Sequence, residues 1–177
     1  MKTQVIVLNG SSSSGKTTIA RCLKAILPTA WISLSIDDLL RALPPSLMDS
    51  EAGIAFGEHG EITIGEGFRE VTSGWLAGLA AMARAGTRII YDDVFLSGAE
   101  SQEQLRTQLA DLPVLWVGVH CDAEVAAGRE IARGDRVVGG AASQSTKVHE
   151  GVTYDLEVDT TSTESLECAR TIAAQVP

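Results

Sequence analysis

The sequence V-I-V-L-N-G-S-S-S-S-G-K-T, at residues 5–17, decides the fold. From Gly10 to Thr17 it fits the phosphate-binding pattern G-x-x-x-x-G-K-[ST] at every fixed position. An apolar, β-branched run precedes the pattern, and a helix-like segment, Thr17–Leu27, follows it. A strand, a glycine-rich loop and a helix in this order surround an anion with backbone N–H groups and the positive end of the helix. The stretch therefore predicts a site for nucleotide phosphates.

The residues of this loop have separate expected roles. Lys16 is expected to neutralise the β- and γ-phosphates, and the Thr17 hydroxyl is expected to hold Mg²⁺. The glycines allow backbone dihedrals and a close approach that a Cβ atom would prevent. The alternative is a flexible turn rich in serine and glycine, without a ligand. The residues expected to bind the nucleotide are Gly10, Ser11, Ser12, Ser13, Ser14, Gly15, Lys16, Thr17 and Thr18.

The bulk composition bounds the class of protein. A chain of 177 residues, 45% of them hydrophobic, is long enough for one folded domain, residues 1–177. Its formal net charge of -9 argues against a nucleic acid partner, because no basic surplus can neutralise a phosphate backbone. No apolar run approaches the ~20 residues of a membrane span, and no secretory signal is visible. The three cysteines are an odd number without metal-ligand spacing, and together with the absence of a visible secretory signal they favour a cytoplasmic protein. Whether the protein forms a homo-oligomer stays open.

Apolar runs alternate with helical patterns along the chain. The predicted strands are Val5–Leu8, Trp31–Ile36, Arg88–Tyr91, Val114–His120 and Asp155–Val158. The predicted helices are Thr17–Leu27, a segment from Phe68 to Met82 that stops at Gly86, one around Leu105 and Leu109, Ala123–Ala132 and Ser165–Val176. Continuous apolar strands joined by helices indicate a parallel sheet that is covered on both faces. We therefore expect an α/β protein, a three-layer sandwich around a five-stranded parallel sheet.

Two segments break this regular alternation. Residues 44–67 contain two prolines and five glycines, and they predict a loop insertion with a small hairpin at Glu61–Ile64. Loops of this length often close over or line a binding site, although a solvated excursion without function is the alternative. The insertion contains no Lys, Arg, Asn or Gln, which favours a ligand with little charge. Gly134–Gly151 is also irregular, and we expect a lid over about residues 129–147.

Acidic residues follow the second and third predicted strands. The carboxyl ends of parallel strands share the edge of the sheet where ligands bind, so these carboxylates are expected near the phosphates. Asp37 is the predicted base, which accepts a proton from an acceptor hydroxyl. The alternative is a helix cap for a segment that begins at Leu39, and one residue of the pair Asp37 and Asp38 can cap while the other takes part in the chemistry. Asp92 is expected to hold the Mg²⁺ shell through water, with substrate binding or capping as alternatives.

Three arginines lie in one short segment of this acidic chain. Arg129 and Arg133 share a helix face at four-residue spacing, and Arg136 follows the helix breaker Gly134. Guanidinium groups that close over a transferring phosphoryl group neutralise its charge, so we expect Arg133 and Arg136 to take part in catalysis. The alternative is a solvated ion-pair face with Glu124 and Glu130. The segment Tyr154–Thr161 is a candidate support for adenine, and the three histidines are interpreted as structural or solvent-facing.

These motifs together resemble the chloramphenicol phosphotransferase family, a small-molecule kinase branch of the phosphate-loop proteins. The resemblance covers essentially the whole chain and rests on residues 8–10, 21–23, 27–28, Trp31, Asp37, 89–96, 114–122, 128–137, 148–152 and 158–161. It implies a P-loop, nucleoside-kinase-like fold with a helical lid. It also implies transfer of the ATP γ-phosphate to the primary 3-hydroxyl of chloramphenicol. The proposed catalytic aspartate of the family falls on Asp37, and its lid arginines fall on Arg133 and Arg136.

We therefore expect an ATP- and Mg²⁺-dependent kinase for a small hydroxylated molecule, which inactivates an antibiotic if the acceptor is chloramphenicol. The alternatives are a kinase for another hydroxylated metabolite, a nucleotide-binding regulatory NTPase, and, against the net charge, a polynucleotide-end kinase. An acceptor that carries an arene needs apolar walls. The candidates are Met48, Phe56, Phe68, Trp75, Val94 and Phe95.

Overall fold

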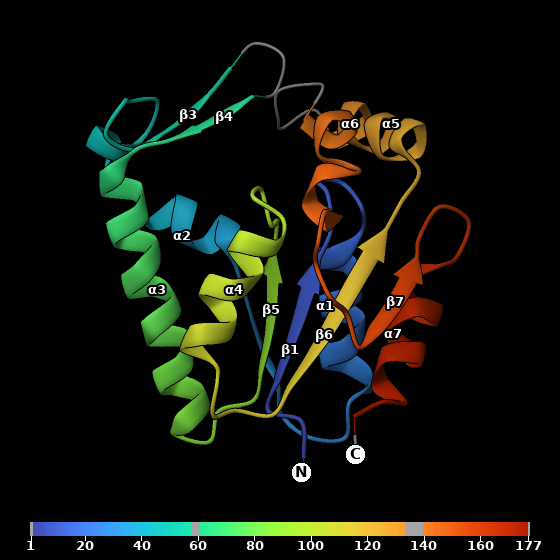
Figure 1. The fold of residues 1–177 in the computed structure, drawn as a ribbon. Coiled ribbons are helices and arrows are strands. Elements are labelled where there is room, and N and C mark those ends of the chain that lie inside the picture. Colours follow the sequence, from blue (N-terminus) through green and yellow to red (C-terminus); the bar gives the residue numbers. More distant parts are fainter. Residues whose placement is uncertain (1, 58–60, 134–139, 177) are drawn as a thin grey trace.

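A five-stranded parallel sheet forms the centre of the protein, as the sequence predicts. The computed structural model describes residues 2–57, 61–133 and 140–176. The strands are β1 (Val5–Asn9), β2 (Ile32–Ser35), β5 (Ile89–Asp93), β6 (Val114–His120) and β7 (Leu156–Asp159), in the order β2-β5-β1-β6-β7. All four pairings are parallel (Figure 1). The predicted α/β fold class is confirmed.

Helices cover the two faces of this sheet. The helices are α1 (Lys16–Ile26), α2 (Ile36–Ala42), α3 (Glu66–Arg84), α4 (Ala99–Gln108), α5 (Ala123–Arg133), α6 (Gly140–Gln144) and α7 (Ser165–Ala173). On one face, buried side chains of α1 and α7 form a core with Ile6, Leu8 and Ile90. On the other face, α3 and α4 pack against Val5, Val7 and Tyr91. Alternate residues of one strand therefore face different helices, which decides where each carboxylate at the strand ends points.

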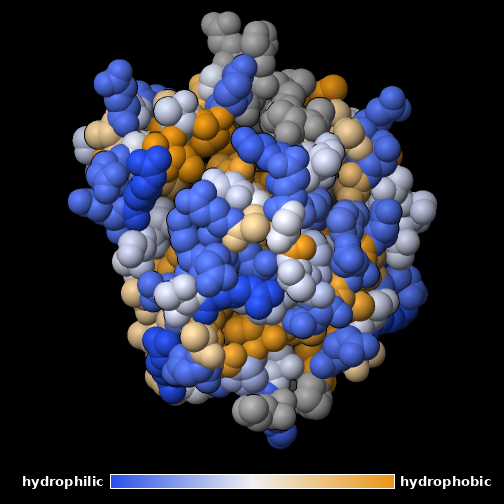
Figure 2. Space-filling view, in the orientation of Figure 1, coloured by the Kyte–Doolittle hydropathy of each residue, from blue (hydrophilic) through white to orange (hydrophobic). Residues whose placement is uncertain are grey.

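The insertion at residues 44–67 folds onto its own small core. It contains a 3₁₀ turn (Pro45–Leu47) and two antiparallel strands, β3 (Ile54–Phe56) and β4 (Ile62–Ile64). A hairpin is thus present, but the predicted range Glu61–Ile64 contains only β4, and its other strand, β3, lies earlier in the chain. Its apolar side chains pack with α2 and the start of α3 in a third core cluster around Leu39, Ile54 and Phe68. Figure 2 shows an apolar area below the hairpin, in the upper left of the view, with hydrophilic residues around it.

The start of α2 corrects the sequence analysis. Strand β2 ends at Ser35 instead of Ile36, and the helix begins at Ile36 instead of Leu39. The reason is a capping box: the Ser35 hydroxyl accepts the Asp38 N–H at 3.2 Å, and the Asp38 carboxylate accepts the Ser35 N–H at 2.7 Å. The helix cap is therefore Ser35, with Asp38 as its reciprocal partner.

No helix in the described part of the chain is long and apolar enough to span a membrane.

Candidate active site

The phosphate loop joins β1 to α1 at the carboxyl edge of the sheet. A Cβ atom on Gly10 would lie 2.3 Å from the Val119 carbonyl oxygen, so only glycine lets the loop start this close to β6. Gly15, with φ at 93°, turns the chain into α1 through the left-handed region. The Lys16 ammonium is buried and donates to the carbonyl oxygens of Gly10 at 2.9 Å and Ser11 at 2.7 Å. These contacts curl the loop around the lysine, as an anion cradle requires.

A pocket of about 410 Å³ opens beside this loop. The loop and the start of α1 form one wall, the start of α2 forms another, and α5 and α7 contribute one residue or two each. Asp37 lines the pocket, whereas Asp38 is held in the capping box and paired with Arg41. Burial acts to raise the pKa of Asp38, but the hydrogen bonds from Ser35 and Arg41 outweigh it and hold the pKa below its usual value. The other lining residues are Ser12, Ser13, Gly15, Lys16, Thr17, Thr18, Ser35, Ile36, Asp92, Val94, Arg129, Ala132 and Ser165.

Thr17 and Asp92 lie together on the floor of the pocket. The Thr17 hydroxyl donates to Asp92 Oδ2 at 2.8 Å, and the Lys16 ammonium lies 3.9 Å from Asp92 Oδ1. A hydroxyl and a carboxylate at this distance, next to a phosphate cradle, match the few protein ligands that Mg²⁺ takes when phosphate and water supply the rest. The hydroxyls of Ser13 and Ser14 are buried and make no hydrogen bond with any described residue. The donor set therefore fits a metal–nucleotide ligand.

Asp93 points to the opposite face of β5 from Asp92. Its carboxylate accepts the Val94 N–H at 2.7 Å and lies near the Tyr91 hydroxyl. Burial is the main cause that raises the pKa of Asp93 to about 6, and the charge of Asp92 adds to it. Because Asp92 contacts Thr17 and Lys16 while Asp93 faces α3, the geometry favours Asp92 for the metal.

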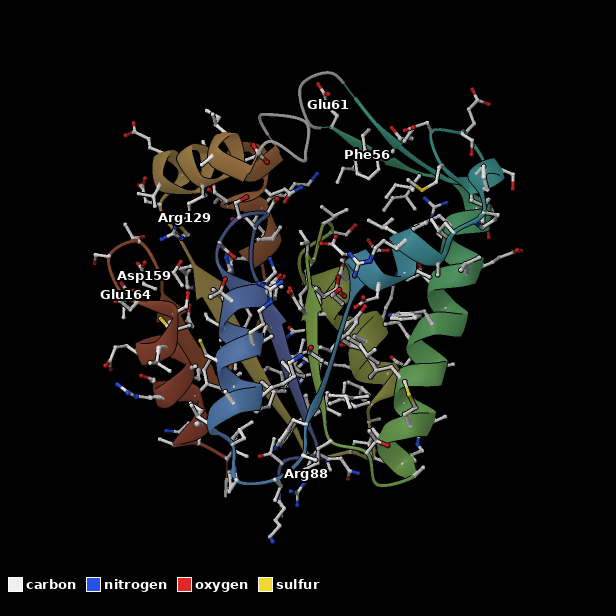
Figure 3. All side chains as sticks on the ribbon, turned by 180° about the vertical axis from the view of Figure 1, so that it is seen from behind. Phe56, Glu61, Arg88, Arg129, Asp159 and Glu164 are labelled. Carbon is white, nitrogen blue, oxygen red and sulfur yellow. The ribbon has the colours of Figure 1, made fainter. Side chains whose placement is uncertain are left out.

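Arg129, on α5, connects three loops at the edge of the pocket (Figure 3). Its guanidinium donates to the Thr160 carbonyl oxygen at 2.7 Å, to the Thr160 hydroxyl at 3.2 Å and to Cys121 Sγ at 3.3 Å. Thr160 in turn donates to the Ser14 carbonyl oxygen at 2.7 Å. The sequence analysis placed Arg129 beside Arg133 but did not include it among the site residues. Arg133 is the last residue of α5, and Arg136 lies outside the described residues.

Gln144, on α6, is a second residue that sequence reasoning missed. Its side-chain oxygen accepts the backbone N–H of Ser12, in the phosphate loop, at 2.9 Å. Gln144 is 8% exposed, so this contact is shielded from solvent. The irregular segment after Gly134 was predicted to be a lid, but nothing in its pattern distinguished the glutamine. The contact joins α6 directly to the loop that is expected to bind phosphate.

A polar network behind the loop includes two histidines. Asn9 donates to the Val148 carbonyl oxygen at 2.7 Å and to the Tyr154 hydroxyl at 2.6 Å, and it accepts the Phe95 N–H at 2.9 Å. The Tyr154 hydroxyl lies 2.6 Å from His149 Nδ1, and the His149 ring stacks on His120 at 4.1 Å. These contacts agree with a structural role for both histidines, and His59 lies outside the described residues.

We expect His149 to make the protein less stable in acid. Burial, and then the charge of His120, lower the pKa of His149 to about 4, below its usual 6.5. Folding thus favours the neutral ring, so this stabilising contribution is complete above about pH 6.5 and is lost as the pH falls towards 4. Chemical denaturation of the protein and of His149→Gln between pH 7 and pH 4 checks this. The free energy of unfolding should fall more steeply in the parent protein, and equal slopes would contradict the assignment.

The fold is similar to that of several solved structures. Three solved structures cover 98% of this chain, each at 21% sequence identity or less. They are a shikimate kinase from Acinetobacter baumannii (TM-score 0.63, 17% identity, 92% of that chain), the tunicamycin resistance protein of Deinococcus radiodurans (0.65, 21%, 95%) and the APS kinase of Mycobacterium tuberculosis (0.62, 15%, 96%). The chain therefore has the fold of the P-loop kinases.

The family narrows this class to the small-molecule kinases. Residues 3–177 match the chloramphenicol phosphotransferase-like family, and the chain belongs to that family. A relative in two strains of Mycobacterium tuberculosis, provisionally named an O-phosphotransferase, is 31% identical over 179 aligned positions, which cover 94% of this chain and 79% of the relative. The predictions of the family and of a small-molecule kinase are thereby confirmed.

Proposed function

We propose that this protein transfers the γ-phosphate of ATP to a hydroxyl of a small molecule, with the 3-hydroxyl of chloramphenicol or a related antibiotic as the first acceptor to test. The observation that carries the proposal is the position of Asp37, which lines the same pocket as Lys16 and Thr17. Asp38 takes the structural role at the start of α2. The chain thus has a carboxylate for proton transfer beside the phosphate cradle.

Each of these pocket residues has its own role in the proposed reaction. Asp37 accepts the proton of the acceptor hydroxyl, and the hydroxyl oxygen forms a bond to the γ-phosphorus. The bond between the γ-phosphorus and the β–γ bridging oxygen breaks, and ADP leaves. Lys16 and the loop amides stabilise the charge that develops on the phosphates. Thr17, and Asp92 through water, would hold Mg²⁺, which would neutralise the same phosphates.

The insertion supplies the chemistry expected of an acceptor site. On the hairpin, Ile54 pairs with Ile64 and Phe56 with Ile62, so four apolar side chains share one face. Phe56 is 39% exposed and points from β3 towards the body of the molecule (Figure 3). Of the other proposed walls, Phe68 and Phe95 are core residues, at 5% and 1% exposure, whereas Val94 lines the pocket. An acceptor with an arene and few charges suits this surface.

The test is a search for a phosphorylated product. The pure protein is incubated with Mg-ATP and a panel that includes chloramphenicol, shikimate, gluconate and a nucleoside, and mass spectrometry looks for the added phosphate. We expect an adduct on chloramphenicol. An adduct on another compound would keep the kinase and change its acceptor. ATP hydrolysis that is indifferent to every hydroxyl compound would instead favour a regulatory NTPase.

We further propose that the segment over about residues 129–147 acts as a lid, with Arg133 and Arg136 at the transferring phosphoryl group. Removal of a guanidinium that acts only in the transition state lowers kcat and leaves nucleotide affinity nearly constant. We therefore expect Arg136→Ala to lower kcat by about 10³-fold, with a nearly unchanged Kd for ATP. Single-turnover kinetics and calorimetry measure the two quantities. A weakened Kd with normal chemistry would make Arg136 a binding residue only.

A further inference from the structure

Strand β5 separates two carboxylates onto the two faces of the sheet. Ile90 lies in the core beside α1, and Asp92, two residues on, contacts Thr17 of that helix. Tyr91 lies in the core beside α3, and Asp93, two residues on, faces the same side. Asp93 is mostly buried, with part of its surface accessible. Because the two side chains lie on different faces of the sheet, the metal-binding role proposed for Asp92 does not extend to Asp93.

Buried polar atoms without hydrogen-bond partners gather at two places in the described chain. Buried polar groups in native proteins nearly always have a partner, so each exception points to a missing water, ion or ligand. Two of the atoms belong to the phosphate loop, where the nucleotide is expected. Three belong to α3 and β5, and the last is the indole nitrogen of Trp31 in the other core. The six atoms are Ser13 Oγ, Ser14 Oγ, Trp31 Nε1, Thr72 Oγ1, Trp75 Nε1 and Tyr91 OH.

Two of these atoms, on Trp75 and Tyr91, adjoin Asp93. Thr72 and Trp75 are one turn apart on the face of α3 that packs inward. The Tyr91 hydroxyl approaches both the Trp75 indole and the Asp93 carboxylate, but neither contact has the geometry of a full hydrogen bond, and Tyr91 itself is fully buried. Trp75 also packs against the third core cluster, below the hairpin. Unused donors thus adjoin a carboxylate at the base of the apolar insertion.

We propose that Asp93, Tyr91 and Trp75 form a polar subsite that binds a second hydroxyl or an amide of the acceptor, apart from the hydroxyl that is phosphorylated. This inference rests on the proposed function. The carboxylate accepts an O–H or N–H of the acceptor, and the indole N–H donates to an oxygen. Asp92 and Asp93 repel an acceptor that carries a carboxylate here. The subsite therefore selects neutral molecules with an apolar part and at least two polar groups, and it disfavours sugar acids.

The position of Asp93 connects the subsite to the reacting hydroxyl. Val94, the next residue, lines the nucleotide pocket together with Ile36 and Asp37. Ile36 also packs against the third core cluster, so the pocket and the insertion share a wall. Consecutive Cα atoms are only about 3.8 Å apart, which keeps Asp93 close to the pocket. The proposed subsite thus adjoins the wall of the nucleotide pocket at Val94.

Steady-state kinetics with the acceptor found in the screen test the subsite. We expect Asp93→Asn to raise the acceptor KM about tenfold or more, and Tyr91→Phe to raise it about threefold to tenfold, with the ATP KM unchanged. Tyr91→Phe is informative because it removes the hydroxyl and keeps the buried ring. Trp31→Phe is the matched control, since it removes the buried, unpartnered indole of the opposite core. Unchanged acceptor KM values in both test variants would overturn the proposal.

A binding experiment separates this inference from the proposed reaction. The indole N–H signals of the ¹⁵N-labelled protein are assigned with Trp75→Phe and Trp31→Phe, and each compound of the panel is titrated in, beginning with chloramphenicol. We expect the Trp75 signal to shift while the Trp31 signal stays. A shift without phosphorylation of that compound would sink the proposed reaction and keep the subsite. Phosphorylation of a compound without a shift of the Trp75 signal would keep the proposed reaction and overturn the subsite. If no compound is phosphorylated and none shifts the signal, both proposals are wrong.

Discussion

Lys16→Ala is expected to abolish detectable phosphoryl transfer while the fold is retained. The ammonium is held in the loop by the carbonyl oxygens of Gly10 and Ser11, and it lies 3.9 Å from Asp92 Oδ1. Its removal takes away the fixed positive charge at the phosphates, and electrostatic stabilisation of this kind is among the largest contributions to catalysis. We expect a loss of about 10³-fold or more in kcat/KM for ATP, measured by coupled ADP release.

Lys24→Ala is the matched control for this substitution. Lys24 lies in the last turn of the same helix, α1, and is exposed. It should retain the activity of the parent protein, and circular dichroism should show the same helix content in both variants. A Lys16→Ala protein that is folded and retains more than a tenth of the parent rate would contradict the assignment of the phosphate loop.

Asp37→Asn is expected to lower kcat by about 10²- to 10⁴-fold, the range over which a general base contributes. The amide occupies the same space but cannot accept the proton of the acceptor hydroxyl. Binding of ATP depends on the loop amides and Lys16, so the Kd for ATP should change little. Rapid-quench measurement of a single turnover, combined with calorimetry, separates the two quantities.

For Asp38→Asn we expect a loss of stability with little loss of activity, because we propose that Asp37 acts in catalysis while Asp38 stabilises the start of α2. Asp38 is held by Ser35 and Arg41 at the start of α2, and the loss of such a cap costs about 0.5–2 kcal/mol of stability. We expect a lower Tm with kcat within a few-fold of the parent value. A large loss of kcat in Asp38→Asn together with a near-normal Asp37→Asn would exchange the two assignments.

The sequence contained enough information for the sheet and the phosphate loop because both depend on local patterns. The β-branched runs specify buried parallel strands, and the spacing from Gly10 to Thr17 is tied to a backbone geometry. The start of α2 was misplaced because Ser35 has the pattern of a strand end, and its role as a cap depends on the hydrogen bond that its hydroxyl accepts from the Asp38 N–H. Local patterns alone do not show which of two competing short-range arrangements the backbone adopts.

The remaining site residues depend on contacts that are distant in sequence. Gln144 meets Ser12 across 132 positions, and Arg129 meets Thr160 across 31. Such pairs leave no spacing signal in a single sequence. The division between Asp92 and Asp93 is different, because strand alternation predicts that they face opposite ways. Which face carries the nucleotide becomes clear only when α1 is placed on the side of Asp92.

The side chain of Asn9 limits how hybrid enzymes can be assembled from relatives of this protein. Its amide group donates to Val148 and Tyr154 while its oxygen receives the N–H of Phe95, a combination that an aspartate, which lacks donors, cannot reproduce. A graft that replaces residues 147–154 must therefore bring a compatible tyrosine, or the start of the nucleotide loop loses its anchorage. The insertion at residues 44–67, which rests on a core of its own, is the more exchangeable segment for redirecting the enzyme to a new acceptor.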